Sequence, residues 1–293
     1  MHATVGPPII EHELLMLAYR SGIFPMADRR DDPDIFWVEP RLRAILPLDG
    51  LHLSRSLAKT LRRGRYAVTC NVAFTQVVEA CAAPREEDGG DSWISHRIQA
   101  SYENLHRLGL AHSIECWDVD EAGQRTLAGG LYGVGFDRVF CGESMFSHRT
   151  DASKVALCWL VAALKRGGGE LLDCQFITPH LQSLGAVEIP QARYLELLKQ
   201  AQGPGPRQRQ DHRQENGRGQ AGASSAPSSA AGAAAGAGAA GAAGAEVGLA
   251  EGAGAGDSLA LPDAFAALLA DAAEAGLSSS PGKLISHFLS QTS

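Results

Sequence analysis

Three polar side chains interrupt two stretches whose other residues favour buried β-strands. The stretch "FCGESMFS" contains Glu143, and the stretch "LLDCQF" contains Asp173 and Gln175. A carboxylate in apolar surroundings must be paired, hydrogen-bonded, solvated in a cleft or protonated, because leaving it bare costs several kcal/mol or more. Glu143 therefore marks either a functional cleft or a structural ion pair with an arginine.

The spacing of Asp173 and Gln175 adds a geometric constraint. Residues two apart on a strand point to one face, so these two side chains share a face and Cys174 points to the other. A carboxylate beside an amide could orient a substrate amine. The alternative is a structural hydrogen-bond network, because both groups must be satisfied if they are buried.

Other reactive side chains lack the neighbours that would activate them. No histidine is placed by sequence beside Cys141 or Cys174, no serine stands in a GxSxG elbow, and no CxxC pair or zinc-spaced histidine is present. We therefore expect no metal, and six reduced thiols as in a cytosolic protein. The side chains that we expect to be structural or unreactive are Ser144, Ser147, His112, His148 and His180.

The elements that must position these residues follow from the pattern around them. "GGLYGVGFDRVF" holds two β-rich runs around a Gly-Phe-Asp-Arg break, which predicts a hairpin with Glu143 at the end of a buried strand. A helix should follow, with Asp151 as its N-cap and Gly167 as its stop, before the strand "ELLDCQFI". This order predicts a mixed sheet with a helix packed across it, in an α+β or α/β core.

Composition bounds the function classes. The 293 residues are 45% hydrophobic, enough for a substantial core, and the net charge of -7 argues against a general nucleic-acid coat. No signal peptide is recognisable, and the longest apolar run, "VALCWLVAAL", has half the length needed to span a bilayer. We expect a soluble cytoplasmic protein.

A low-complexity insert occupies residues 203–258. It begins with a stretch rich in Gly, Pro, Gln, Arg and Ser, followed by an almost pure Ala/Gly run. Frequent glycine opposes the helix that alanine favours, and little side chain is available for burial. We predict a disordered linker here and a partly helical tail over residues 259–293.

One short segment is strongly basic despite the acidic chain. "HLSRSLAKTLRRGR" contains five Lys or Arg residues and no acid. On a helix its charged residues share one face and its leucines another. A solvated surface helix and a phosphate-binding face are both consistent with this pattern. The residues of the basic face are Arg55, Lys59, Arg62 and Arg63.

A series of motifs from about Leu14 to Leu198 carries a resemblance to one family. In chain order they include "AYRSGIFPM", "LHLSRSLAKTLRR", "SWI", "GGLYGV", "FCGESMFS", "LLDCQ" and "SLGA.EIP". Together they closely resemble the leucyl/phenylalanyl-tRNA-protein transferases. The chain departs from the family pattern at Met26, where Trp is frequent, at Leu131, where Met is frequent, and in lacking the usual "GLLA.GGDL" before Glu13.

The resemblance implies an aminoacyltransferase that needs no cofactor. It would move Leu or Phe from aminoacyl-tRNA to the α-amino group of proteins with N-terminal Arg or Lys, creating a bacterial N-end rule degradation signal. The implied enzyme is cytoplasmic, without membrane contact, and a monomer. The implied fold is α+β, with a small N-terminal domain over residues 1–52 and a GNAT-like catalytic domain over residues 53–202.

The resemblance also implies roles for particular residues. Asp173 and Gln175 match the catalytic pair, in which the carboxylate orients and polarises the amide that meets the reacting amine, and Glu143 would help hold the cationic acceptor. Tyr19 would lie near the terminal adenosine of the tRNA, and the basic face would meet the acceptor stem. The residues implied for the aminoacyl pocket are Trp93, Tyr102, Leu131, Phe140 and Leu160.

Two rival functions remain. A GNAT-type acetyltransferase would need a pyrophosphate loop of the form [RQ]xxGx[GA], and the nearest stretches, "QSLGAV" and "RLGLA", do not match it. A non-enzymatic tRNA- or degron-binding module would explain the basic face but not the shared face of Asp173 and Gln175.

Overall fold

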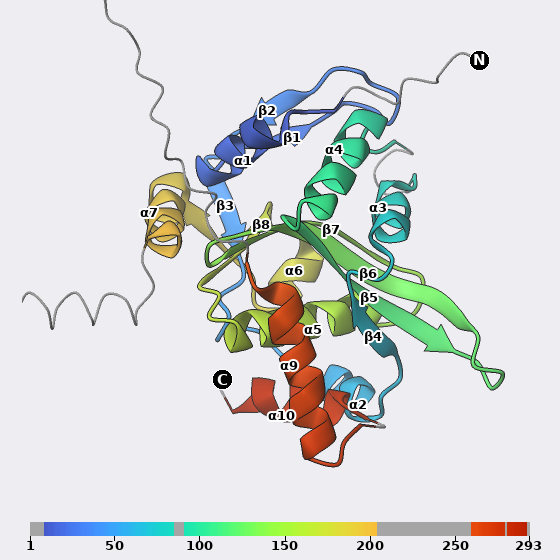
Figure 1. Ribbon diagram of the computed structural model, residues 1–293. Coiled ribbons are helices and arrows are strands. Elements are labelled where there is room, and N and C mark those ends of the chain that lie inside the picture. The colour runs from blue at the N-terminus through green and yellow to red at the C-terminus, as the bar shows by residue number, and fades with distance from the viewer. Residues whose placement is uncertain (1–8, 85–90, 204–258, 279, 292–293) are drawn as a thin grey trace, which may run out of the picture. The chain divides into compact units, whose positions relative to one another are not determined.

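The computed structural model describes residues 9–84, 91–203, 259–278 and 280–291 (Figure 1). The predicted linker over residues 203–258 lies outside these ranges, except for Gly203. Described residues on both sides of it belong to one compact unit. The tail is therefore part of the same unit as the residues that precede the insert.

A seven-stranded sheet forms the centre of this unit. Its strand order is β4-β5-β6-β7-β8-β3-β9, and every neighbouring pair is antiparallel except β7 and β8, which run parallel. This confirms the predicted α+β class with a mixed sheet. The strands are β3 (Leu42–Ile45), β4 (Ala67–Cys70), β5 (Ala111–Val119), β6 (Arg125–Phe136), β7 (Val139–Ser147), β8 (Leu171–Gln175) and β9 (Val187–Pro190).

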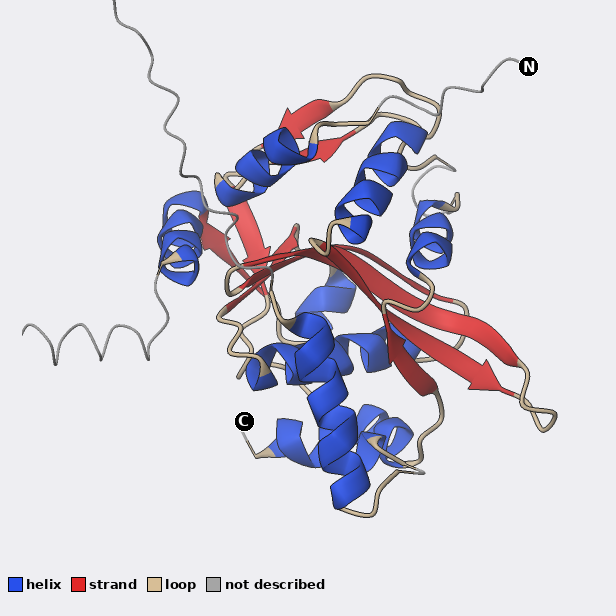
Figure 2. Cartoon of the chain, in the orientation of Figure 1, coloured by secondary structure: helices blue, strands red, loops and turns tan. Residues whose placement is uncertain are grey.

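Helices cover both faces of the sheet (Figure 2). Successive side chains of β6 point to opposite faces of the sheet, because Leu131 belongs to one buried cluster and Tyr132 to the other. We call these clusters the α5 core, which contains Leu131, and the tyrosine core, which contains Tyr19, Tyr102, Tyr132 and Tyr194. The helices beside the α5 core are α2 (Arg55–Arg62), α5 (Ala152–Arg166), α6 (Pro179–Ser183), α9 (Leu261–Glu274) and α10 (Gly282–Ser290). Those beside the tyrosine core are α1 (His12–Arg20), α3 (Phe74–Ala82), α4 (His96–Arg107) and α7 (Gln191–Gln202).

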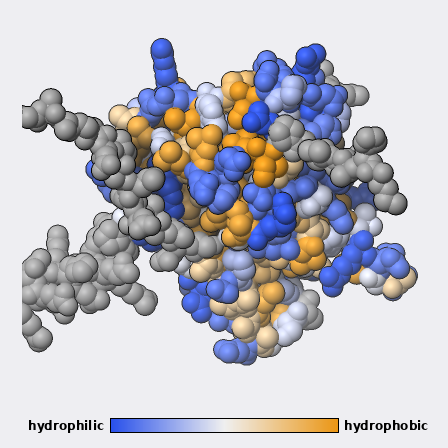
Figure 3. All heavy atoms as spheres, turned by 45° about the horizontal axis from the view of Figure 1, so that its top comes forward, coloured by the Kyte–Doolittle hydropathy of each residue, from blue (hydrophilic) through white to orange (hydrophobic). Residues whose placement is uncertain are grey.

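The first elements of the chain contribute side chains to the tyrosine core. Helix α1 is followed by β1 (Phe24–Met26) and β2 (Phe36–Val38), which pair antiparallel with Phe24 opposite Val38. This part also carries apolar side chains on the surface, at Leu14, Leu17 and Trp37. In Figure 3, whose view brings the top of Figure 1 forward, hydrophobic residues lie among hydrophilic ones.

The predicted hairpin is confirmed, with a correction to the place of Glu143. Strands β6 and β7 pair antiparallel, and Asp137, in the turn between them, has a φ of 50°, in the left-handed region that Asp tolerates. Glu143 lies in the middle of β7 rather than at the end of a strand.

Asp151 occupies the predicted N-cap position of the long helix, but its side chain does not cap the helix. Asp151 precedes α5, but its φ of 63° is left-handed and its side chain makes no capping hydrogen bond. The carboxylate instead pairs with Lys154, with 3.1 Å between Oδ1 and Nζ. Gly167 ends α5 as predicted.

No helix in the described part of the chain is both long enough and apolar enough to cross a membrane.

Candidate active site

Two β-bulges bring the polar residues of the site together. On β7 the register passes from Tyr132 opposite Ser144 to Gly133 opposite Gly142, so Glu143 is an extra residue. A bulge of this kind bends its strand and re-aims a side chain. Glu143 therefore leaves the regular alternation of β7.

The second bulge lies on β8. Its register against β3 passes from Ile45 opposite Asp173 to Ala44 opposite Gln175, which leaves Cys174 extra, and Gln175 has a φ of 61°. The paired residues of β7 and β8 end at Cys141 and Asp173. The two parallel strands thus part where Glu143 and Gln175 lie.

Glu143 is the centre of a buried hydrogen-bond cluster. Its Oε1 accepts from the Tyr19 hydroxyl at 2.7 Å and from Gln175 Nε2 at 2.8 Å, and its Oε2 accepts from the Tyr102 hydroxyl at 2.7 Å. The two tyrosine oxygens are 2.6 Å apart. Three donors from three elements therefore hold one carboxyl group.

The environment of Glu143 places its ionisation near neutrality. Burial raises its pKa from 4.5 to about 7, although the hydrogen bonds from Tyr102, Tyr19 and Gln175 lower it. Burial and the nearby Glu143 charge raise the pKa of both tyrosine hydroxyls well above 10, so the tyrosines remain donors. The site thus holds a carboxyl group that can gain or lose a proton at physiological pH.

Asp173 is held by a second cluster. Its Oδ1 accepts from Arg43 Nε at 2.8 Å and from the main-chain N–H of Gln175 at 2.9 Å. Its Oδ2 accepts from Arg43 Nη2 at 2.6 Å and from the Tyr194 hydroxyl at 2.9 Å. With four donors and no solvent exposure, this carboxylate has no oxygen facing a ligand.

Arg43 is as buried as its partner. Its guanidinium lies between the rings of Phe24 and Tyr194, 4.7 and 4.5 Å from their centroids, and Nη1 donates to the Gly22 carbonyl at 3.0 Å. Burial by itself lowers the pKa of Arg43, but the Asp173 carboxylate raises it above the ordinary value. Arg43 therefore remains a cation beside this carboxylate.

Asp173 and Gln175 lie on the same side of the sheet, as expected, but their side chains do not contact each other in the expected way. Both bond to groups of the tyrosine-core side, whereas Cys174 packs against the α5 core. The Asp173 carboxylate bonds the main chain of Gln175, and the amide side chain bonds Glu143 instead. The expected direct contact between the Asp173 carboxylate and the amide is not present.

A pocket of about 1000 Å³ lies beside Glu143 and Gln175. Part of its wall belongs to the α5 core and part to the tyrosine core, so it reaches both sides of the sheet where β7 and β8 part. The wall residues of the α5 core are Leu131, Met145, Leu157, Leu160, Leu172, Cys174 and Leu181. Those of the tyrosine core include Met26, Ala80, Trp93, Tyr132 and Phe146.

The residues expected to line the aminoacyl pocket, together with Tyr19, expected near the terminal adenosine, separate into three groups. Trp93, Leu131 and Leu160 line the pocket. Tyr19 and Tyr102 are almost fully buried and hold Glu143 in place without lining the pocket. Phe140 is fully buried in the α5 core.

Several residues of the site are absent from the sequence prediction. Arg43 and Tyr194 come from segments far from residue 173, and no local pattern connects them. Tyr132 lines the pocket with a buried hydroxyl that has no hydrogen-bond partner among the described residues. The motif "GGLYGV" contains this tyrosine, so the motif was available as a signal.

The basic helix forms as predicted but away from the pocket. On α2 the leucines Leu57 and Leu61 are buried, Arg55, Lys59 and Arg62 are exposed, and Arg63 is the exposed C-cap. None of the four basic residues lines the pocket.

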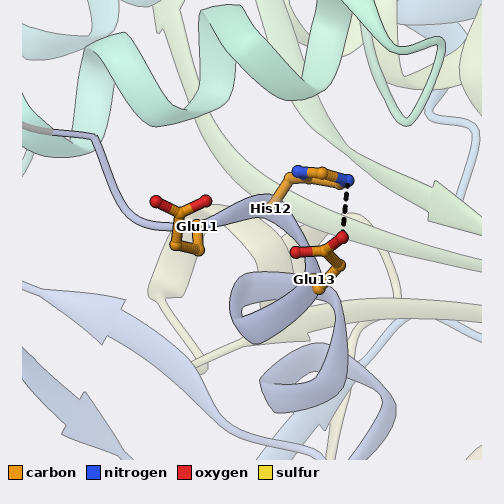
Figure 4. A group of neighbouring side chains, drawn as sticks. All are labelled: Glu11, His12 and Glu13. Atoms are coloured by element: carbon orange, nitrogen blue, oxygen red, sulfur yellow. Dashed lines mark ion pairs between the residues drawn. The ribbon is translucent and has the colours of Figure 1, made fainter.

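Neither the thiols nor an exposed cluster of possible metal ligands adds chemistry to the pocket. Burial raises the pKa of Cys141 and Cys174 well above that of a free thiol, which disfavours a thiolate nucleophile. Glu11, His12 and Glu13 lie close enough to share an ion (Figure 4), but both carboxylates are exposed and His12 pairs with Glu13 at 3.6 Å. We assign no site to this group.

Comparison with known proteins identifies the family. Residues 45–199 match the model of the leucyl/phenylalanyl-tRNA protein transferases, and residues 10–41 match the model of their N-terminal domain. A leucyl/phenylalanyl-tRNA–protein transferase of Novosphingobium aromaticivorans is 66% identical over 200 residues, 68% of this chain and 74% of the relative. One of Zymomonas mobilis is 55% identical over 193 residues, 66% of this chain and 70% of the relative. The chain belongs to the leucyl/phenylalanyl-tRNA protein transferase family and is a transferase.

Proposed function

We propose that this protein transfers Leu or Phe from aminoacyl-tRNA to the α-amino group of proteins that begin with Arg or Lys. The product would be a degradation signal of the bacterial N-end rule, made in the cytoplasm by a monomeric enzyme. The observation that carries this proposal is the Glu143–Gln175 pair at a pocket that continues into apolar walls. A GNAT-like catalytic domain over residues 53–202, preceded by a small domain over 1–52, is part of the proposal.

Gln175 would orient the attacking amine. The Gln175 amide nitrogen donates to Glu143, which leaves the amide carbonyl oxygen for a donor in the pocket. An incoming amine is such a donor. Asp173 acts here as a positioning residue, because it holds the left-handed main chain of Gln175.

Glu143 would accept the proton that the acceptor must lose. An α-ammonium group has a pKa of about 7.7 to 8.0, close to the pKa of about 7 of Glu143, so proton transfer between them is nearly balanced. The neutral amine then attacks the ester carbonyl carbon. The new C–N bond forms, the bond to the tRNA 3′ oxygen breaks, and that oxygen takes a second proton from the amine.

The two ends of the pocket suit the two substrates. The leucine-rich wall of the α5 core would take the Leu or Phe side chain, whose burial stabilises binding by about 1.5 to 3 kcal/mol. On the other side, the wall includes Trp93, an aromatic residue of the kind that binds cationic side chains, and Tyr132, whose buried hydroxyl has no partner among the described residues. Glu143 adds the negative charge that favours an N-terminal Arg or Lys.

The exposed face of α2 would contact tRNA phosphates. Contacts to phosphate supply affinity without reading the base sequence, so one enzyme could accept several tRNAs. Because the net charge of the chain is negative, we expect phosphate contacts at this locally basic helix.

The test of the proposed function is a transfer assay with Phe-tRNA and two peptides that differ only in an N-terminal Arg or Asp. We expect mass spectrometry to show one added Phe on the Arg peptide alone, and none when acetyl-CoA replaces Phe-tRNA. Equal modification of both peptides would refute the specificity for basic N-termini. Acetylation of the Arg peptide would favour the acetyltransferase.

A further inference from the structure

The tail over residues 259–291 lies beyond the part of the chain that matches the transferase models, which ends at residue 199. It nevertheless completes the α5 core. The Phe265 ring lies 5.1 Å from that of Trp159 on α5, and at Gly167 an added Cβ would lie 3.1 Å from the Ala264 Cβ. The large apolar side chains that the tail buries in this core are Leu259, Leu261, Phe265, Leu268, Ile285 and Leu289.

The end of the tail docks on the basic helix, where Figure 1 shows α10 beside α2. At Gly282 an added Cβ would lie 2.2 Å from the Leu61 carbonyl oxygen, so only glycine permits this approach. The Ser280 hydroxyl donates to the Arg62 carbonyl at 2.9 Å, and Arg62 Nη1 donates to the Ser286 hydroxyl at 3.4 Å. The contact therefore involves a residue of the basic face itself.

The exposed side of α10 adds one lysine, Lys283, to this region. Lys283 and His287 are exposed and one helical turn apart, and His287 is next to Ser286, the partner of Arg62. Helix α10 contains no acidic residue. Two acids lie near these helices. Asp118 pairs with Arg65 at 3.5 Å, and Asp49 pairs with Lys165, whose Nζ is 6.0 Å from the Phe288 ring of α10.

We propose that α10 and α2 form one composite surface for the phosphate backbone of the RNA substrate. In it Lys283 adds a phosphate contact to the basic face, and the docking of Gly282 on Leu61 holds α2 in position. This inference rests on the proposed role of α2 in tRNA binding, and it gives the tail a part in substrate recognition.

The test measures tRNA affinity of the full chain at several salt concentrations, by fluorescence anisotropy, for Lys283→Ala and its matched control Lys199→Ala. Lys199 is exposed near the end of α7. We expect Lys283→Ala to weaken binding several-fold and to reduce the slope of log affinity against log salt by about 0.7 to 0.9, the value for one lost phosphate contact. Lys199→Ala should bind like the unaltered protein.

A third variant, Arg62→Ala, separates the two proposals. Weaker binding by Arg62→Ala with unchanged binding by Lys283→Ala would overturn the composite surface and leave the α2 proposal standing. Unchanged binding by both would overturn the tRNA role of α2 as well. Equal losses for Lys283→Ala and Lys199→Ala would show a general charge effect and also overturn the composite surface.

The variant Gly282→Ala tests whether the docking of α10 holds α2 in position, and it changes no charge. The added methyl group should displace α10 from Leu61, lower the melting temperature and weaken tRNA binding well below that temperature. A lower melting temperature with native tRNA affinity would show a purely structural tail. If this variant does not fold, the Lys283 comparison still decides whether α10 contacts the RNA.

Discussion

Glu143 and Gln175 fix each other's orientation, and each is fixed in turn by residues distant in the sequence. The tyrosines of α1 and α4 hold Glu143, and Arg43 with Tyr194 holds the carboxylate that binds the Gln175 main chain. The spacing of residues 173 and 175 predicted their shared face from regular strand alternation, and it gave no sign of the bulge at Cys174 that lies between them. The partners Arg43 and Tyr194 could not be predicted, because only the folded sheet brings them to Asp173.

The pKa of Glu143 makes stability depend on pH. Between pH 4.5 and about 7 the folded protein binds more protons at this group than the unfolded chain, so the free energy of unfolding falls as the pH rises. The total loss is on the order of 3 kcal/mol by the time Glu143 is ionised. We expect urea unfolding to show a free energy of unfolding that falls with pH across this range in the unaltered protein, and a smaller fall in Glu143→Gln. A stability difference between the two proteins that is independent of pH would contradict the account.

Arg43→Lys tests the positioning role of the buried ion pair. Lysine keeps the charge but loses the two-pronged contact to Asp173, so Gln175 should be held less firmly. We expect the transfer rate constant to fall about tenfold or more, with the KM for tRNA within about twofold of native. The matched control, Arg41→Lys at an exposed position two residues earlier, should behave as native. A native rate in Arg43→Lys would show that the pair does not position Gln175.

At the scale of elements, the site depends on irregularities in β7 and β8. The hairpin, the helix that follows and the next strand could all be predicted from turn residues and apolar runs. The two bulges could not, because an extra residue in one strand is defined only by its pairing with the neighbouring strand. Likewise Asp151 has a capping residue's identity and position, yet its left-handed backbone directs the carboxylate to Lys154.

The bulge at Glu143 requires glycine opposite it. A Cβ at Gly133 would lie 2.2 Å from the Cys141 carbonyl oxygen and 2.5 Å from the Phe140 ring, whereas a Cβ at Gly142 would meet its nearest neighbour at 3.4 Å. We expect Gly133→Ala to destabilise the protein by about 1 to 3 kcal/mol and Gly142→Ala to cost less. Thermal unfolding of both variants measures this difference. Equal stability would mean that the hairpin accommodates the methyl group without strain.

At the scale of the whole molecule, residues on both sides of the insert share one core. The composition of residues 203–258 predicted an interruption of the fold, but it gave no reason to expect that the tail returns to α5 and α2. That return depends on apolar residues spaced three or four apart on α9, which pack against buried residues of α5 such as Trp159 in the folded protein.

A shared core should unfold in a single transition. Phe265→Ala should lower the free energy of unfolding by about 3 to 5 kcal/mol, because it opens a cavity against Trp159. The control Leu269→Ala, on the same helix but 40% exposed, should cost far less. Two separate transitions, with only the smaller one sensitive to Phe265→Ala, would show that the tail folds apart from the transferase core.

The central claim is that the Gln175 amide orients the acceptor amine beside Glu143. Its most direct measurement is the single-turnover rate of Phe transfer to an Arg-initiated peptide by Gln175→Ala, at saturating Phe-tRNA, with Gln182→Ala at an exposed position as control. We expect a loss of about 100-fold for Gln175→Ala, with native tRNA affinity, and no loss for Gln182→Ala. A rate for Gln175→Ala within twofold of native would contradict the account.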